Sequence, residues 1–395
     1  SIFAWSIGNE IDYPNDPYSH PVLSGTGKDG FTQPIFGGYQ KESPDAMRLG
    51  TIAKKLASVV RQYDKSRPVT AALAGVAMSN ETEYPGALDI AGYNYTESFY
   101  LSDHKKYPNR VIYGSENGHS FDAWKAVTEN PYIFGQFLWT GIDYLGEAGS
   151  WPSRGFSAGL LDLGGFVKPR GYFRQSLWSD KPMAYIGTYL LVQNNERTPS
   201  IDALPVWNYD ASQTIRVACY TNAAKARLEL NGKQVGDIQN YNHQTGIIYW
   251  DIPYQAGKLE VIGLDKGNKE IARYAIQSSK QPDALTITIC HVEKAIDRNK
   301  ELTQIIVQVV DENGVPVLLS DNEVTCHISG PAKLLGLEAG NITDMTDYTD
   351  NKQRVFHGCL IAYIQTSGEK GEIKVQFSSP WLKSTETIIQ AANSD

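Results

Sequence analysis

The sequence predicts two fold types in one chain: strands four to eight of a (β/α)8 TIM barrel, followed by two immunoglobulin-like β-sandwich domains. Residues 1 to about 195 alternate apolar, strand-like runs with helical or loop connections, which is typical of parallel α/β structure. From about Arg197 the helical periodicity disappears and short alternating runs follow one another. Turns such as Asn231-Gly232 separate these later runs and indicate β-hairpins.

Five apolar runs follow one another in the first half, and four of them end on a polar or aromatic residue. The five runs are Ile2–Glu10, Arg67–Leu73, Leu88–Tyr95, Val111–Glu116 and Ile133–Trp139. A closed barrel needs eight strands, so these runs would be its last five, and we expect the chain to be a fragment whose first three strands lie upstream. A doubly wound sheet is the alternative. It usually carries a glycine-rich phosphate loop after its first strand, and the sequence has none.

An amphipathic helix is expected between the first two runs. Residues 43–45, Ser-Pro-Asp, are typical of a helix start. The residues spaced to bury one face are Met47, Ile52, Leu56, Val59 and Val60.

The domain boundaries are predicted from these changes in pattern. Residues 1–196 form the C-terminal part of the barrel, 197–280 the first sandwich and 284–395 the second, with a polar linker between the two sandwiches. The strands expected in the first sandwich are Thr214–Tyr220, Ala226–Leu230, Gly246–Ile252, Lys258–Asp265 and Glu270–Ile276. Those expected in the second are Leu285–Ile289, Leu302–Asp311, Glu323–Ser329, Arg354–Gln365, Gly371–Ser378 and Ser384–Ala391.

Composition limits the partners. The chain has 36 Lys and Arg residues against 44 Asp and Glu, a net charge of −8 with no basic cluster, so nucleic acid is not an expected partner. No apolar run approaches the ~18–20 residues of a membrane span. The four cysteines lack the close spacing of metal sites, and no metal or cofactor is expected. Buried free thiols are the preferred interpretation, with a Cys326–Cys359 disulfide as the alternative in an exported protein.

Glu10 and Glu116 are the candidate catalytic residues. Each ends an apolar run, and the C-terminal ends of parallel strands meet at one rim of a barrel. Cleavage of a glycosidic bond requires one carboxylic acid to protonate the leaving oxygen and a second carboxylate to attack or to activate water. In a retaining enzyme the two carboxyl groups lie about 5–5.5 Å apart. For each residue alone, a loop salt bridge is the alternative.

Five further residues are candidate substrate contacts. Asn9 is suited to hydrogen-bond a sugar hydroxyl, Tyr95 to donate to the nucleophile and keep it ionised, and Trp139 to offer its ring face to the sugar. His119 and Asp143 are rim candidates for hydroxyl recognition. The aromatic content of 11%, with 23 Tyr and 8 Trp, suits sugar binding, although such residues also fill cores.

The run Trp5-Ser6-Ile7-Gly8-Asn9-Glu10 resembles the acid/base signature of glycoside hydrolase family 2, the β-galactosidase and β-glucuronidase family. The segment Gly159–Trp178 is also similar to exported β-galactosidase-type members from Bacteroides-like bacteria. The resemblance implies that Glu10 is the acid/base and Asn9 the contact to the sugar 2-hydroxyl. It likewise implies two β-sandwich domains after the barrel.

For the remaining site residues the resemblance implies that Glu116 is the nucleophile and Trp139 the platform of the sugar subsite. The implied function is a retaining exo-β-glycosidase that hydrolyses terminal non-reducing β-D-galactosides through a glycosyl-enzyme. The glucuronidases of this family carry an Asn-x-Lys element that recognises the sugar carboxylate, and no convincing counterpart is found after Trp139, which favours a galactoside. The alternatives are a β-glucuronidase or β-mannosidase of the same family, or a non-catalytic carbohydrate-binding protein.

The expected partner is an oligosaccharide or glycoside, and the expected location is periplasmic or secreted. Assembly into a homo-oligomer is left open. The 395-residue chain made alone is expected to lack significant activity, because five strands cannot close an eight-stranded barrel.

Overall fold

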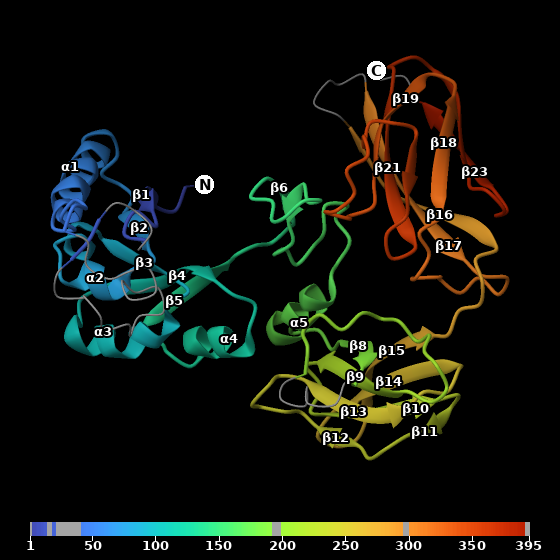
Figure 1. Cartoon of the computed structure of the whole chain (residues 1–395), viewed down its shortest axis with the longest axis horizontal. Helices are drawn as coiled ribbons and strands as arrows, with labels where there is room; N and C mark the ends of the chain where they lie inside the picture. The colour runs from blue at the N-terminus through green and yellow to red at the C-terminus, as the bar shows by residue number, and fades with distance from the viewer. Residues whose placement is uncertain (1, 14–17, 21–40, 192–198, 295–299, 392–395) are drawn as a thin grey trace. The chain divides into compact units, whose positions relative to one another are not determined.

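The chain divides into two compact units, Ser1–Trp139 and Thr140–Asp395 (Figure 1). This computed structural model describes residues 2–13, 18–20, 41–191, 199–294 and 300–391. Among the helices of these ranges, none combines the length and the apolar character that crossing a membrane requires.

The first unit is built around one parallel sheet. Its elements are β1 (Trp5–Asn9), α1 (Arg48–Tyr63), β2 (Val69–Leu73), α2 (Val76–Asn80), β3 (Ile90–Asn94), α3 (Tyr100–Lys106), β4 (Val111–Asn117), α4 (Phe121–Thr128) and β5 (Ile133–Leu138). The sheet order is β1-β2-β3-β4-β5, and each neighbouring pair is parallel. The five runs predicted as strands are therefore confirmed, and all their C-terminal ends lie at one edge of the sheet.

A helix forms where the first helix was predicted, but it buries a different face from the predicted one. Helix α1 begins at Arg48, and its buried residues are Leu49, Gly50, Ala53 and Ala57. The predicted Met47, Leu56 and Val59 are exposed. Small side chains allow close approach: a Cβ on Gly50 would lie 2.8 Å from the Glu83 Cβ. The prediction relied on large apolar residues, whereas three of the four buried residues of α1 are Gly or Ala.

The two faces of the parallel sheet differ. One face packs on the helices, through a core that includes Leu49, Leu73, Tyr93 and Ile112. The opposite face carries aromatic side chains, with the Tyr113 ring centroid 5.2 Å from that of Phe134 and 5.9 Å from that of Phe137. Phe134 is 48% exposed and Phe137 59% exposed. The sheet therefore has one covered and one open apolar face.

The second unit begins with a largely irregular segment and continues as strands. Its first elements are β6 (Tyr144–Leu145), β7 (Gly155–Phe156) and α5 (Pro169–Trp178). A first two-sheet region follows, with β8 (Ala184–Leu190), β9 (Thr214–Thr221), β10 (Lys225–Leu230), β11 (Lys233–Gln234), β12 (Gln239–Asn240), β13 (Ile248–Pro253), β14 (Lys258–Leu264) and β15 (Glu270–Gln277).

Two antiparallel sheets enclose one core in this first two-sheet region. One sheet has the order β13-β9-β8, and the other has β11-β10-β14-β15 with β12 paired to β10. Trp207 and Trp250 are buried in the core, and their indole N–H groups donate to the backbone carbonyls of Gln255 and Asp237. The predicted hairpin at Asn231-Gly232 is confirmed: both residues have positive φ, 51° and 77°, and Leu230 pairs with Lys233.

Strand β8 corrects the predicted domain boundary. It pairs along its whole length with β9 and so belongs to the first two-sheet region, although the sequence analysis assigned residues up to 196 to the barrel part. The predicted boundary at 196/197 itself lies outside the described residues. The first strand of the second two-sheet region, β16, begins at Ala284, where the second sandwich was predicted to start.

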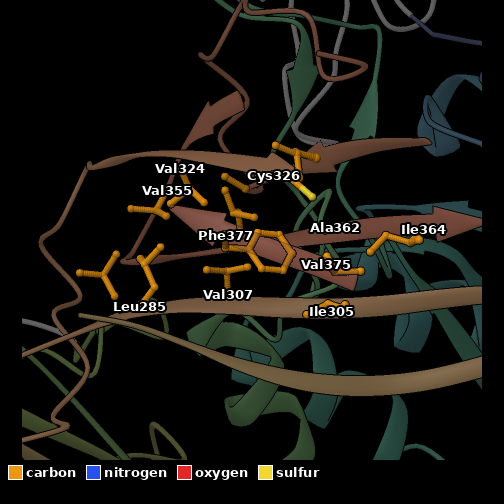
Figure 2. Packing of buried hydrophobic residues seen from close by; sticks show 14 of the residues in the cluster. Leu285, Ile305, Val307, Val324, Cys326, Val355, Ala362, Ile364, Val375 and Phe377 are labelled. Atoms are coloured by element: carbon orange, nitrogen blue, oxygen red, sulfur yellow. The ribbon is translucent and has the colours of Figure 1, made fainter. Parts of the chain in front are cut away.

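The second two-sheet region has the sheet orders β16-β17-β21-β19 and β20-β18-β22-β23. Its strands are β16 (Ala284–Lys294), β17 (Glu301–Val310), β18 (Glu323–Ser329), β19 (Ala332–Glu338), β20 (Lys352–Arg354), β21 (Cys359–Thr366), β22 (Gly371–Ser378) and β23 (Thr385–Ala391). Side chains of both sheets gather around the fully buried Phe377, as Figure 2 shows.

Two predictions for this region are wrong in detail. The run Arg354–Gln365 is not one strand, because His357 and Gly358 have positive φ (50° and 72°) and turn the chain between β20 and β21. Strand β19 was not predicted. It follows Gly330-Pro331 and shifts its register at Gly336, and both features weaken a strand pattern in sequence.

The cysteines are free thiols. Cys326 is buried in the core of the second two-sheet region, and Cys359 lies half-buried on a strand of the opposite sheet. Burial raises the pKa of each thiol to about 12. The preferred interpretation, buried free thiols, is confirmed for Cys219 and Cys326 and wrong for the exposed Cys290, and the alternative Cys326–Cys359 disulfide is not formed.

Replacing Phe377 with Ala is expected to lower the free energy of unfolding of the second two-sheet region by about 3–5 kcal/mol, because a fully buried ring leaves a cavity. Hydrogen exchange of the slowest amides of β17 and β22, measured in the whole chain, tests this. The matched control is Ile388→Ala on β23, since Ile388 is 53% exposed and its loss should change stability by about 0.5 kcal/mol or less. Equal effects of the two substitutions would contradict this account of the core.

Candidate active site

The candidate site lies at the C-terminal ends of β1, β3 and β4. Asn9 is the last residue of β1 and Asn94 the last of β3, and Glu10 and Tyr95 follow them directly. Asn94 pairs in register with Glu116 on β4. The parallel pairing thus brings residues that are far apart in the sequence to one edge of the sheet.

A register shift on β4 directs Glu116 toward this edge. Tyr93 pairs with Gly114 and Asn94 with Glu116, so Ser115 is an extra residue opposite the β3 strand. Regular alternation would send Ser115 and Glu116 to opposite faces of the sheet. With the shift, the Ser115 hydroxyl donates to the Asn94 side-chain oxygen at 2.6 Å, and Glu116 also contacts the Asn94 side chain. Bulges commonly redirect a side chain in this way.

Ser115 fits only because its neighbour on β3 is a glycine. A Cβ placed on Gly92 would lie 2.5 Å from the Ser115 hydroxyl oxygen and 2.6 Å from its Cβ. Any side chain at position 92 would therefore displace Ser115, and with it the hydrogen bond to Asn94.

Glu10 and Tyr95 share an unusual backbone conformation. Both have φ of 53°, in the left-handed region that non-glycine residues rarely adopt. The Glu10 N–H donates to the Ala72 carbonyl at 2.9 Å, and the Tyr95 N–H donates to the Glu116 carbonyl at 2.9 Å. Strained conformations of this kind cost about 1–3 kcal/mol and persist where the surroundings hold them, often at functional sites.

Asn94 is the central hydrogen-bonding residue of the site. It is fully buried, and its amide group donates to a Glu10 carboxyl oxygen at 3.0 Å and to the Asn9 side-chain oxygen at 3.2 Å. Its own oxygen accepts from Ser115. A buried amide that is satisfied on both sides is held in one orientation, so Asn94 fixes the Glu10 carboxyl in place.

The environment of Glu116 combines opposing effects on its pKa. Burial, and then the negative charge of Glu10, raise the pKa of Glu116, whereas hydrogen bonds from Tyr95, Asn94 and Asn9 lower it. The Tyr95 hydroxyl donates to the Glu116 carboxyl at 3.2 Å. The net direction is upward. The effect of Glu10 on this pKa indicates that its carboxyl lies near Glu116.

The other predicted residues are placed as follows. Trp139 directly follows β5, and its backbone N–H donates to the carbonyl of Asn117, the last residue of β4. His119 lies two residues beyond Asn117 and is half-buried. A cavity of about 440 Å³ opens beside Tyr95, between the residues that follow β3 and those that follow β4.

Asp143 belongs to the second unit, where its carboxylate already accepts hydrogen bonds from other groups of the protein. It is 4% exposed and accepts from the Lys168 ammonium group at 2.9 and 3.1 Å and from the Gly159 N–H at 2.7 Å. These bonds tie the irregular start of this unit to the beginning of α5. A substrate contact by Asp143 stays a prediction.

Within the ranges that the structure covers, no group of three or more His, Cys, Asp or Glu side chains is arranged to hold a metal ion. The chemistry available at the edge of the first unit is that of a carboxyl pair. One member can give a proton, while the other, if ionised, can attack or stabilise a developing positive charge.

Sequence reasoning identified Glu10, Glu116, Asn9 and Tyr95 and missed Asn94. A signal was available, because Asn94-Tyr95 repeats the arrangement of Asn9-Glu10: an Asn that ends a strand, followed by the next residue at the rim. Only the pairing of the strands shows that the Asn94 side chain lies between two carboxyls.

Two protein-family models match parts of the second unit. Residues 290–388 match the model described as glycoside hydrolase family 2 C-terminal domain 5. Residues 212–272 match a domain of unknown function, DUF4982. The matched ranges fall within the second and the first two-sheet regions.

Two curated relatives are similar over most of the chain. Beta-galactosidase BoGH2A from Bacteroides ovatus is 26% identical over an alignment covering 99% of this chain and 50% of that protein. A putative beta-glucuronidase from Formosa agariphila is 30% identical over 64% of this chain and 23% of its own length. The chain thus spans half or less of these relatives.

A solved structure is similar in fold. The glycosyl hydrolase family 2 member from Bacteroides cellulosilyticus has a TM-score of 0.80 and 26% identity, covering 98% of this chain and 48% of that one.

The pKa of Glu116 should respond in opposite directions to two substitutions. Glu10→Gln removes a neighbouring negative charge and should lower it, whereas Tyr95→Phe removes a stabilising donor and should raise it. Titration of ¹³C-labelled Glu carboxyls by NMR in the complete protein that carries this sequence measures both changes. Glu97→Gln is the control: Glu97 binds Asn117 and is not among the causes of the Glu116 shift. Shifts in the same direction would contradict the described contacts.

Proposed function

The chain belongs to glycoside hydrolase family 2, and on that basis we propose that it carries the catalytic carboxyl pair of a retaining exo-β-glycosidase. The observation that supports this most is the arrangement of Glu10 and Glu116 around Asn94 at one edge of a parallel sheet. Double displacement requires two neighbouring carboxyl groups, one as nucleophile and one as acid/base.

We assign the nucleophile to Glu116 and the acid/base to Glu10. Glu116 receives hydrogen bonds from Tyr95, Asn94 and Asn9, and three donors favour an ionised carboxylate. Its raised pKa taken alone would suit an acid. The rise comes from burial and from the charge of Glu10, and the second contribution disappears when Glu10 is protonated and ready to act as the acid.

The reaction then has two steps. Glu116 attacks the anomeric carbon while Glu10 gives its proton to the leaving oxygen, and a glycosyl-enzyme forms on the Glu116 carboxylate. Glu10, now ionised, takes a proton from water, which attacks the same carbon and releases the sugar with the anomeric configuration retained. In this scheme Asn9 contacts the sugar and Trp139 provides a ring face for it.

We also propose that the parallel sheet is the last part of a TIM barrel and that the two-sheet regions are immunoglobulin-like sandwiches. Sequential strand order with helices on one face is the arrangement of a singly wound barrel, whereas a doubly wound sheet reverses its order and is covered on both faces. The exposed Phe134 and Phe137 lie on the face that would point into the barrel.

Galactosides are the proposed substrates, and glucuronides are the second candidate. The names of the two similar proteins, a beta-galactosidase and a putative beta-glucuronidase, divide between these sugars. The Asn-x-Lys run that does follow Trp139 in the sequence, Asn231-Gly232-Lys233, forms the β10–β11 hairpin of the first two-sheet region and does not belong to the parallel sheet, which favours the neutral sugar.

Glu116→Ala should abolish turnover of every aryl glycoside, because no glycosyl-enzyme can form. Glu10→Ala should lower kcat/KM by about 10²–10⁴-fold for leaving groups that need protonation, and far less for dinitrophenyl glycosides, which need none. Steady-state kinetics of the complete protein test this, with Glu129→Ala, an exposed carboxyl after α4, as the control. Equal losses on good and poor leaving groups in both variants would remove the support for the two roles.

The sugar is tested by comparing nitrophenyl β-galactoside, β-glucuronide and β-mannoside at equal concentration. We expect the highest kcat/KM for the galactoside, since the contacts given above for Glu10, Asn94 and Glu116, within the described residues, include no cationic side chain to pair with a sugar carboxylate. A preference for the glucuronide would select the second candidate and leave the carboxyl-pair assignment untouched.

A further inference from the structure

Asp12 is a buried carboxyl that the proposed mechanism does not use. It lies two residues after Glu10 and is fully buried. One carboxyl oxygen accepts from the Ala74 N–H at 3.0 Å, and the other accepts from the Gly75 N–H at 3.2 Å and from the Ser79 hydroxyl at 2.5 Å. All three donors belong to the segment that follows β2, so Asp12 joins the chain after Glu10 to the neighbouring strand's end.

The contact between these two segments is close. A Cβ on Gly75 would lie 2.5 Å from the Asp12 carbonyl oxygen, so position 75 accepts no side chain while the segment stays in place. The Glu10 carbonyl accepts from the Tyr13 N–H at 2.9 Å, closing a turn across Asp12. The segment from Glu10 to Tyr13 is therefore held both internally and against β2.

Glu10 needs such support because of its backbone. Its φ of 53° is unfavourable for a residue with a side chain, and the Ala72 carbonyl fixes only its N–H side. Asp12 fixes the chain on the other side. Burial raises the pKa of Asp12 to about 6, although the hydrogen bonds from Ser79 and the backbone lower it. Keeping this carboxyl buried as an anion therefore costs free energy.

We propose that Asp12 is a positioning residue that holds Glu10 in its left-handed conformation and thereby aims the acid carboxyl at the leaving-group oxygen. The proposal rests on the proposed role of Glu10. If Asp12 acts through Glu10, its loss should impair the proton-transfer step selectively. If Asp12 only stabilises the fold, its loss should affect all substrates alike.

The test is Asp12→Asn in the complete protein, assayed with aryl glycosides of high and low leaving-group pKa. We expect kcat/KM to fall by about 10- to 100-fold with the poor leaving group and by less than about threefold with dinitrophenol, since a small displacement of a catalytic group has effects of this size. Ser79→Ala removes one donor to Asp12 and should produce the same selectivity with a smaller loss. If Asp12→Asn does not fold, the leaving-group dependence of Ser79→Ala tests the positioning role instead.

Asp103 provides the matched control. It is also a buried carboxyl of the first unit, 3% exposed, and it accepts from Asn80 and Tyr93 beside Arg110. Asp103→Asn should lower stability and change both substrates by the same factor. A uniform loss, or none, in Asp12→Asn or its substitute Ser79→Ala, together with a leaving-group-dependent loss in Glu10→Ala, would overturn the positioning role alone. A uniform loss in Glu10→Ala would overturn the proposed function as well.

Discussion

The register between β3 and β4 is the constraint on which the candidate site depends. It pairs Asn94 with Glu116 after an extra residue, Ser115, and so places two successive β4 side chains where Asn94 can reach both. A slip of one residue would turn Glu116 to the opposite face of the sheet and leave the buried Asn94 side-chain oxygen without the Ser115 hydroxyl. A second register shift, between Ser6 and Asn9 on β1, precedes Glu10. Each carboxyl is therefore delivered by a strand that departs from regular pairing just before it.

The fold was largely predictable because its strands are apolar and well separated by turns. The five parallel strands and most strands of the two-sheet regions follow from apolar runs, and the hairpin at Asn231-Gly232 follows from residues that tolerate positive φ. Features that depend on partners distant in sequence were not predictable. Helix α1 buries Gly50, where Glu83 approaches closely, together with Ala53 and Ala57, and β8 joins β9 although a long connection separates them.

The candidate site, like the fold, could be predicted from the sequence only in part. The carboxyls were identified by type and position, since an acidic residue after an apolar run is conspicuous. Asn94, Ser115 and Asp12 are ordinary polar residues in sequence, and their importance comes from burial and from hydrogen bonds to residues 21 to 85 positions away. Such bonds depend on strand pairing and register shifts, which local propensity does not encode. The roles of Trp139, His119 and Asp143 stay predictions.

The left-handed backbone at Glu10 also bears on how the residue is removed in the laboratory. Alanine keeps the Cβ and with it the unfavourable φ, whereas glycine adopts this conformation freely and loses more entropy on folding. The two truncations delete the same carboxyl from the same place and differ in backbone strain. Comparing their melting temperatures therefore measures how much folding stability the protein gives up to present an acid at this rim, separately from what the carboxyl itself contributes.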